Sequence, residues 1–339
     1  MLRIVDQNRS AAAFVLLIAL CGVLTLTMQS SIGGLSIYSE SVETRRLQAH
    51  DTILNNKLPD GVESWNSLGA NGTNIRIASV YLAEAMHRVF GISVIHSYWF
   101  IDTISLFLAL FLLYFFLSNW LPRHYAVLGV IYVGSVLPLT YLFALFHPWD
   151  RLSLLSWVVL FMLVQSRRPF ILGVALALSV SIKYDAVLLP GLYWLAHVSH
   201  ARFTRTSLET AALFAVSFGV YFGLRAVLPG GFGGGPSVSA LVAENMQRLI
   251  ELAAFFPPIA YPPFLVFLLP VLLIIFRFPK DDQFLRAAIV FSGVLMFYFF
   301  IRSHFEEVRA HMPLLLLILP AALLSLQRLL EPAEIKSDG

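Results

Sequence analysis

The sequence predicts an all-α fold, a polytopic bundle of about ten transmembrane helices in a single membrane domain over residues 1–330. The first observation is composition. Of the 339 residues, 58% are hydrophobic and only 13% are charged, which is more apolar side chain than one soluble core can bury. The second observation is that apolar runs of about 17 to 25 residues recur along the chain, and a helix of that length crosses the roughly 30 Å hydrocarbon core.

The first predicted span is 11–32. Arg3 and Arg9 precede it and place the N-terminus in the cytoplasm, because basic residues are enriched in cytoplasmic segments. The next segment, 33–92, is then the first outer loop. Its two ends have helical periodicity with mixed polar and apolar faces, which predicts short amphipathic helices along the membrane surface.

The middle of the chain contains a helix that we expect to be broken. The spans before it are predicted at 93–118, 125–146 and 152–166, with basic residues at their inner ends. The following stretch, 169–200, would be about 45 Å long as one straight helix, well beyond the bilayer core. We expect two short helices that meet at Lys183, Tyr184 and Asp185, an arrangement that returns Arg205 to the cytoplasm.

The last part of the chain completes the predicted bundle. Further spans are predicted at 208–228, 259–277, 285–301 and 311–329. A glycine-rich outer loop, 229–237, follows the first of them. Both termini are then cytoplasmic, and the short polar tail 331–339 is expected to be disordered.

Ionisable residues outside the cytoplasmic loops gather on the outer face. The candidates for a functional site are Glu40, Glu43, Arg46, His50, Asp150, Lys183, Asp185, Arg302, Glu307 and Arg309. Charged groups beside hydrocarbon are costly unless paired or hydrated, so such a gathering is typical of a functional cavity. Arg and Lys bind phosphate oxygens and a carboxylate can act as a general base. The alternative is that the outer loops are simply polar and their charges pair with one another.

Several of these candidate residues could instead have a structural role. A helix would place Glu40, Glu43 and His50 on one face, although either glutamate could equally form a solvated pair with a neighbouring arginine. Asp150 stands at the start of a helix, where it is either a cap or an active-site acid. For Lys183 the alternative of a polar loop residue is the least favoured, because the short helices around it would hold it below the outer surface.

Three motifs, taken in their order along the chain, resemble the GT-C class of integral-membrane glycosyltransferases. They are "NIRIASVYLAEAMHRVFG" before the second span, "SVSIKYDAVLLPGL" at the broken helix and "FEEVRAHMPLLLLILP" at the last span. The match covers most of the chain by architecture. The resemblance implies transfer of a sugar from a polyprenyl-phosphate carrier to a cell-envelope glycan or lipid, with inversion, at the periplasmic face of a bacterial inner membrane.

The resemblance also implies roles for single residues. Glu43 or Glu40 would take the place of the catalytic acid in the first loop, where the family most often has Asp. Lys183 would face the carrier phosphate, and Arg309, with Arg302 as a second candidate, would help to neutralise it. Glu307 would orient Arg309 or bind a sugar hydroxyl.

Other classes of function remain open at this stage. The same charges could form the binding site of a transporter or flippase for a lipid-linked or anionic solute, or the chain could be a non-catalytic subunit of a membrane complex. The formal charge of +3 is too small to indicate nucleic-acid binding. The expected partners are therefore the lipid bilayer, a polyprenyl-phosphate-linked sugar and a membrane protein. No cofactor is implied, although a divalent cation, Mg or Mn, held by carboxylates stays open.

Overall fold

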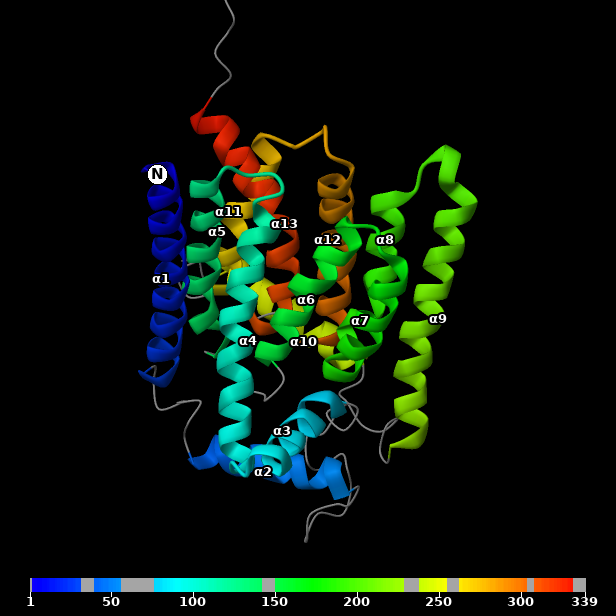
Figure 1. Cartoon of the computed structure of the whole chain (residues 1–339). Helices are drawn as coiled ribbons and strands as arrows, with labels where there is room; N and C mark the ends of the chain where they lie inside the picture. The colour runs from blue at the N-terminus through cyan, green and yellow to red at the C-terminus, as the bar shows by residue number, and fades with distance from the viewer. Residues whose placement is uncertain are drawn as a thin grey trace, which may run out of the picture.

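The computed structural model describes residues 2–31, 40–55, 76–141, 150–228, 238–254, 262–303 and 308–331. These residues form thirteen α-helices and three short 3₁₀ helices (Figure 1). The helices are α1 (Leu2–Ser31), α2 (Glu40–Asn55), α3 (Ile77–Phe90), α4 (Val94–Leu117), α5 (Arg123–Val136), η1 (Leu137–Tyr141), α6 (Asp150–Gln165), α7 (Pro169–Ile182), η2 (Tyr184–Leu188), α8 (Leu189–His197), η3 (His200–Arg202), α9 (Phe203–Val227), α10 (Val238–Ala254), α11 (Pro262–Phe276), α12 (Gln283–Arg302) and α13 (Val308–Leu330). The predicted all-helical fold is confirmed.

The bundle has two distinct ends. The first turn of α1 and the last turn of α13 lie at the same end, which we call the terminus end (Figure 1). Helices α2 and α3 lie across the opposite end, which we call the α2–α3 end. They occupy the region where the sequence predicts short surface helices, and their contact with a membrane surface stays a prediction.

Four helices are long and apolar enough to cross a membrane: α4, η3 with α9, α12 and α13. They make this a candidate multi-pass membrane protein. The predicted number of about ten spans is not shown, because α5, α6, α7, α8 and α11 have 9 to 16 residues. A helix of 16 residues reaches only about 24 Å, less than the roughly 30 Å hydrocarbon core.

Helix α5 shows why the span predicted at 125–146 is shorter. The α-helix ends at Val136 and the chain continues as η1. Pro138 stands two residues later and has no N–H to donate into the helix, so the regular hydrogen-bond ladder stops there. The rest of that predicted span, from residue 142, lies outside the described residues, as do the glycine-rich loop and residues 332–339 of the tail.

Helix α13 forms the centre of the bundle, where it packs against α5, α6, α11 and α12. Every residue from 310 to 323 is buried, as expected for a helix that is apolar on all sides. Gly129 of α5 lets three helices approach closely, because a Cβ atom there would collide with Leu117 of α4 and Leu323 of α13.

Prolines inside the helices leave carbonyl groups without their usual donors. Pro270 in α11 cannot donate to the carbonyl of Val266, four residues earlier. The Tyr132 hydroxyl of α5 donates to that carbonyl instead, at 2.5 Å. Pro313 in α13 has the same effect on the carbonyl of Arg309.

The broken helix lies where the sequence predicts it. Helix α7 ends at Ile182 and Lys183 adopts an extended conformation before η2 and α8. The two helices run in opposite directions along α6. Lys183 lies beside Asp150, the first residue of α6, in one pocket, whereas the His197 ring contacts the carbonyl of Val164 near the other end of α6, at 2.6 Å.

Candidate functional site

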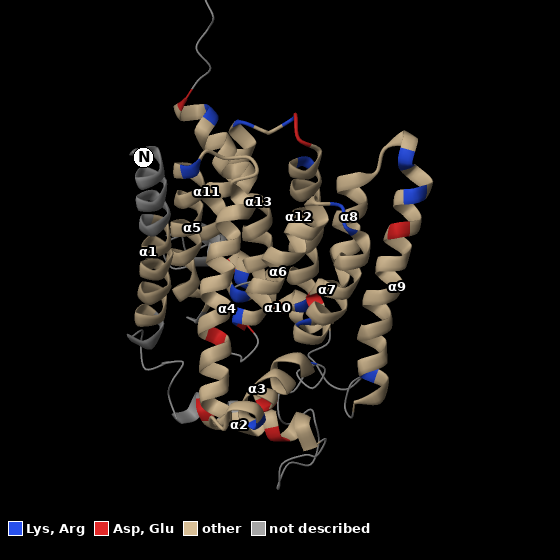
Figure 2. Cartoon of the chain, in the orientation of Figure 1, with Lys and Arg blue, Asp and Glu red and all other residues tan. Residues whose placement is uncertain are grey.

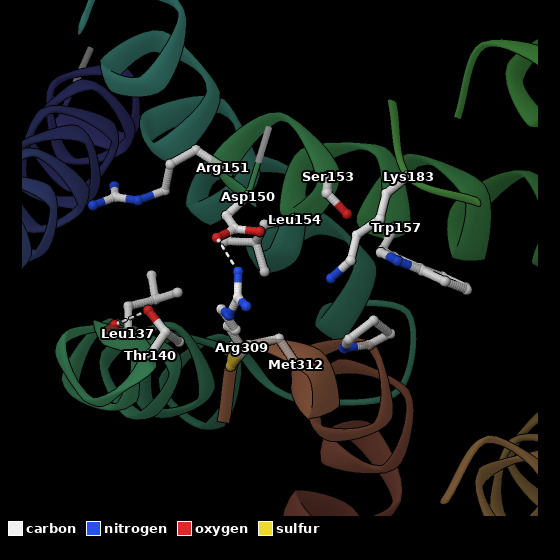
Figure 3. Close-up of a pocket in the computed structure, with 11 residues that line it drawn as sticks. Leu137, Thr140, Asp150, Arg151, Ser153, Leu154, Trp157, Lys183, Arg309 and Met312 are labelled. Atoms are coloured by element: carbon white, nitrogen blue, oxygen red, sulfur yellow. Dashed lines mark hydrogen bonds and ion pairs between the residues drawn. The ribbon is translucent and has the colours of Figure 1, made fainter. Parts of the chain in front are cut away.

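A pocket opens at the α2–α3 end of the bundle, where the first turn of α6, the break after α7, the first turn of α13 and η1 meet (Figure 3). Four charged side chains line it: Asp150, Arg151, Lys183 and Arg309. The rest of the described lining is formed by Leu137, Thr140, Ser153, Leu154, Trp157, Met312 and Pro313. Charged groups therefore face a wall that is mostly apolar.

An ion pair crosses the pocket between two helices that are distant in sequence. The Nη1 atom of Arg309 in α13 lies 3.5 Å from Oδ2 of Asp150 in α6, and the two residues are 159 positions apart. Both side chains are at least five-sixths buried, with 16% and 13% of their surface exposed. Figure 3 shows Arg309 directed at Asp150 across the space between the two helices.

The break between α7 and α8 supplies the third charged group. Because α7 ends at Ile182, the extended backbone of Lys183 turns its side chain out of the helix and toward Asp150 and Trp157 (Figure 3). The Lys183 Nζ atom lies 3.4 Å from Oδ2 of Asp185, and both side chains are about nine-tenths buried. A continuous helix could not present this lysine and this aspartate at the same place.

The pocket has a surplus of positive charge among its described lining residues. Three are cations, Arg151, Lys183 and Arg309, and one is a carboxylate, Asp150. Arg151 is only 2% exposed. Burying cations is costly unless an anion compensates for the lost hydration, and here Arg309 pairs with Asp150 and Lys183 pairs with Asp185 beside the pocket.

Burial controls the acid strength of Asp150, which is the first residue of α6 and lies outside the four candidate spans. Burial raises the pKa of this carboxyl to about 6, although the positive charges of Lys183, Arg76 and Arg151 oppose the shift. Asp185 reinforces it, because a second negative charge nearby disfavours ionisation. A carboxylate with a pKa this close to neutrality is suited to accept a proton.

The described pocket is small. Its cavity volume of about 30 Å³ leaves room for about two water molecules, compared with roughly 300–1,000 Å³ for pockets that bind small ligands. The ion pair between Arg309 and Asp150 lies within it. A group larger than about two water molecules therefore fits only if the side chains around this contact move.

The structure brings together some of the candidates and separates others. Asp150, Lys183 and Arg309 share the pocket, and Asp185 adjoins it. Glu43 lies on α2, which packs against α3 and α4. The side chains of Glu40 and Arg46, and the whole of Glu307, lie outside the described residues.

His50 takes part in a contact between helices. It is 1% exposed, with Nδ1 at 3.0 Å from the Tyr98 hydroxyl and Nε2 at 3.2 Å from Oε2 of Glu84. The Arg88 Nε atom donates to the other oxygen of Glu84. His50 therefore ties α2 to both α3 and α4.

Arg302 is the last residue of α12 and is exposed. It lies near Tyr184, Tyr221 and Tyr298. Lys183 connects this group to the pocket through Asp185, which accepts a hydrogen bond of 3.5 Å from the Tyr298 hydroxyl.

The sequence does not single out Arg151 or Arg76 as binding residues, although both influence Asp150 in the structure. For Arg151 a signal exists, since it stands in the first turn of an otherwise apolar helix. Arg76 precedes α3 and reaches the site only through the packing of α3 on α7. Within the described ranges, no group of three or more His, Cys, Asp or Glu residues could hold a metal ion.

Comparison of the chain with protein-family models, with curated proteins and with solved structures finds no match. The chain is a helical, candidate multi-pass membrane protein with a buried, mainly cationic pocket at one end of its bundle.

Proposed function

We propose that the chain is a membrane glycosyltransferase, which moves a sugar from a polyprenyl-phosphate donor to a glycan or lipid acceptor of the cell envelope. One observation carries the proposal. Lys183, Arg309 and Arg151 converge with Asp150 in a pocket at the end of a bundle of apolar helices. This combination suits a substrate with a phosphate beside a hydrocarbon chain.

The cations match the change of charge during transfer. In the donor the phosphate is a diester with one negative charge. When the acceptor oxygen forms its bond to the anomeric carbon, the bond between that carbon and the phosphate oxygen breaks, and the leaving monoester acquires a second negative charge. Preorganised cations such as Lys183 and Arg309 stabilise charge that develops in this way.

Asp150 is the preferred general base. It accepts the proton of the acceptor hydroxyl as that oxygen attacks, and its pKa of about 6 keeps it mostly ionised at neutral pH. Glu43 and Glu40 are the alternative bases. They lie on α2, which packs against α3 and α4, whereas Asp150 shares the pocket with Lys183 and Arg309.

The proposal includes an orientation with about ten passes, both termini in the cytoplasm and the pocket at the periplasmic face of a bacterial inner membrane. Basic residues support it, because Figure 2 shows many Lys and Arg at the terminus end of the bundle. They include Arg123, Arg168 and Arg205, at the starts of α5, α7 and α9. The positive-inside bias places this end in the cytoplasm.

The test uses membranes that contain the full chain and a radiolabelled sugar on a short polyprenyl phosphate. We expect Arg309→Gln to lower transfer about 100-fold, because it removes a charge-assisted contact to the leaving phosphate. Arg328→Gln serves as the matched control, because Arg328 pairs with Asp281 away from the pocket, and it should leave transfer within about twofold.

Two results would count against the proposal. If Arg309→Gln and Lys183→Ala both transferred sugar at the wild-type rate, the pocket would not hold the phosphate. If reconstituted vesicles showed solute flux with no transferase product, the chain would be a transporter.

A further inference from the structure

Three tyrosines and three arginines form a second cluster beside the pocket, which we call the tyrosine–arginine cluster. It consists of Arg76, Tyr184, Tyr221, Arg225, Tyr298 and Arg302. The segment before α3, the 3₁₀ turn η2 and the helices α9 and α12 contribute these residues. Four separate parts of the chain therefore converge at this point.

Two neighbouring rings lie between two cations along one side of the cluster. The guanidinium carbon of Arg76 lies 5.6 Å from the centre of the Tyr184 ring, and that of Arg225 lies 4.8 Å from the centre of the Tyr221 ring. The two rings are 5.8 Å apart. At these distances each guanidinium is attracted to the electron-rich face of its ring.

Asp185 joins this cluster to the pocket. Its Oδ2 atom lies 3.4 Å from Lys183 Nζ, and its Oδ1 atom accepts a hydrogen bond of 3.5 Å from the Tyr298 hydroxyl. One carboxylate therefore has the pocket lysine on one side and the cluster on the other. Arg76 also acts electrostatically on Asp150, so one arginine of the cluster influences the pocket.

Charge and chemistry in the cluster favour an anion. Arg302 is exposed at the end of a candidate span, and Tyr184, Tyr221 and Tyr298 lie around it. A planar guanidinium binds two phosphate oxygens at once, phenolic hydroxyls add neutral donors, and aromatic walls exclude water and strengthen each contact. The position at the end of α12 suits a phosphate carried by a lipid.

We propose that the tyrosine–arginine cluster is a second phosphate subsite, separate from the pocket and bridged to it by Lys183 and Asp185. It rests on the proposed function in that the pocket is taken as the first subsite. The phosphate in the cluster belongs either to the same lipid, as the second phosphate of a diphosphate carrier, or to a second lipid molecule.

The full chain, purified in a neutral detergent, is titrated with citronellyl phosphate and with citronellyl diphosphate by calorimetry. If the subsite serves a second molecule, the chain binds two equivalents of the monophosphate. If it serves the same molecule, one equivalent of the diphosphate binds about tenfold or more tightly than the monophosphate.

Substitutions show whether each binding event occurs in the pocket or in the tyrosine–arginine cluster. Arg302→Gln and Arg225→Gln should remove the second equivalent, or the tenfold gain for the diphosphate, and leave the first event in place. Arg302→Lys keeps the charge but loses the planar pair of donors, so it should restore the binding only in part. Arg328→Gln is the matched control, because Arg328 pairs with Asp281 at the terminus end and should bind as the wild type does.

The same titrations separate this inference from the proposed function. If only one monophosphate binds and the diphosphate binds no more tightly, there is no second subsite. Isotherms of Arg302→Gln and Arg225→Gln identical to the wild type would also overturn it, and would indicate that these residues only anchor the helices at the membrane edge. If Arg309→Gln alone leaves binding unchanged, the pocket of the proposed function fails while the cluster stands.

Discussion

Two clusters of charged side chains, one around Glu209 at the terminus end and one in the pocket, differ in the lengths of their contacts. At the terminus end, Glu209 of α9 accepts a hydrogen bond from the Tyr193 hydroxyl at 2.6 Å and another from Arg205 Nε at 2.9 Å. Arg167 Nη2 lies 3.7 Å away. In the pocket, Arg309 and Asp150 meet at 3.5 Å and Lys183 and Asp185 at 3.4 Å.

The difference is consistent with a structural role for Glu209 and with the reactive role that we propose for Asp150. Charge-assisted hydrogen bonds are strongest at about 2.7–2.9 Å, and the contacts of Glu209 reach that range, so this carboxylate fastens α9 to α8. The pocket contacts are longer, so they are weaker and easier to exchange for contacts with a ligand. Asp150 and Glu209 therefore form a matched pair for experiments.

Replacing Asp150 should produce the largest effect. We expect Asp150→Asn to lower sugar transfer about 100- to 10,000-fold, because Asn cannot accept the proton of the acceptor hydroxyl. Initial rates per amount of folded protein measure this change, with Glu209→Gln as the control that stays within about threefold of the wild type. Equal losses in the two variants would remove the distinction between the two ends.

Replacing Glu209 should mainly affect stability. Glu209→Gln weakens two charge-assisted hydrogen bonds and should lower the free energy of unfolding by about 2 kcal/mol. Thermal unfolding in detergent, followed by intrinsic tryptophan fluorescence, measures the shift. Ser207→Ala is a milder control, because it removes the hydroxyl that accepts a hydrogen bond of 3.3 Å from Trp194 Nε1. An unfolding temperature of Glu209→Gln equal to that of the wild type would contradict the structural role.

The pH dependence of sugar transfer should distinguish Asp150 in the pocket from the other carboxylates. The base must be ionised, and burial raises the pKa of Asp150 to about 6. Activity should therefore fall as the pH drops through about 6, by close to tenfold between pH 7 and pH 5. The rate of transfer at low donor concentration reports this profile, and Glu43→Gln should keep it. A profile that is flat between pH 5 and pH 7 would exclude Asp150 as the base.

A smaller effect tests a contact away from both ends. Tyr132→Phe removes the hydroxyl that donates to the Val266 carbonyl, whose usual donor is replaced by Pro270. We expect a loss of about 1 kcal/mol in the free energy of unfolding and unchanged transfer. Tyr125→Phe on the same helix offers a comparison, and a larger loss in that variant would show that the proline does not raise the value of the Tyr132 contact.

Much of the fold could be predicted because hydrocarbon thickness limits the length of a helix. The stretch 169–200 was too long for one crossing, and the break lies at Lys183 as expected. Lengths near prolines could not be predicted as well. Pro138 ends the hydrogen-bond ladder of α5 early, although the apolar residues continue beyond it.

The site was less accessible to sequence reasoning. Charge beside hydrocarbon marks Lys183, Asp150 and Arg309 as candidates, but their meeting depends on helices 159 positions apart. His50 is a candidate site residue whose contacts could not be predicted. Its helical face gives no sign of the contacts with Tyr98 and Glu84, 48 and 34 positions away, because only the packing of α2 on α3 and α4 creates them.

Pro313 lines the pocket and lies inside α13, four residues after Arg309. Because it leaves the carbonyl of Arg309 without its helical donor, the first turn of α13 is tethered by fewer backbone bonds than the buried turns that follow. Amide hydrogens of this turn should exchange with solvent deuterium sooner than those of the helix centre. We expect a small rotation of this one turn to carry Arg309 away from Asp150, and the volume of the pocket would then depend on the backbone of α13 as well as on its side chains.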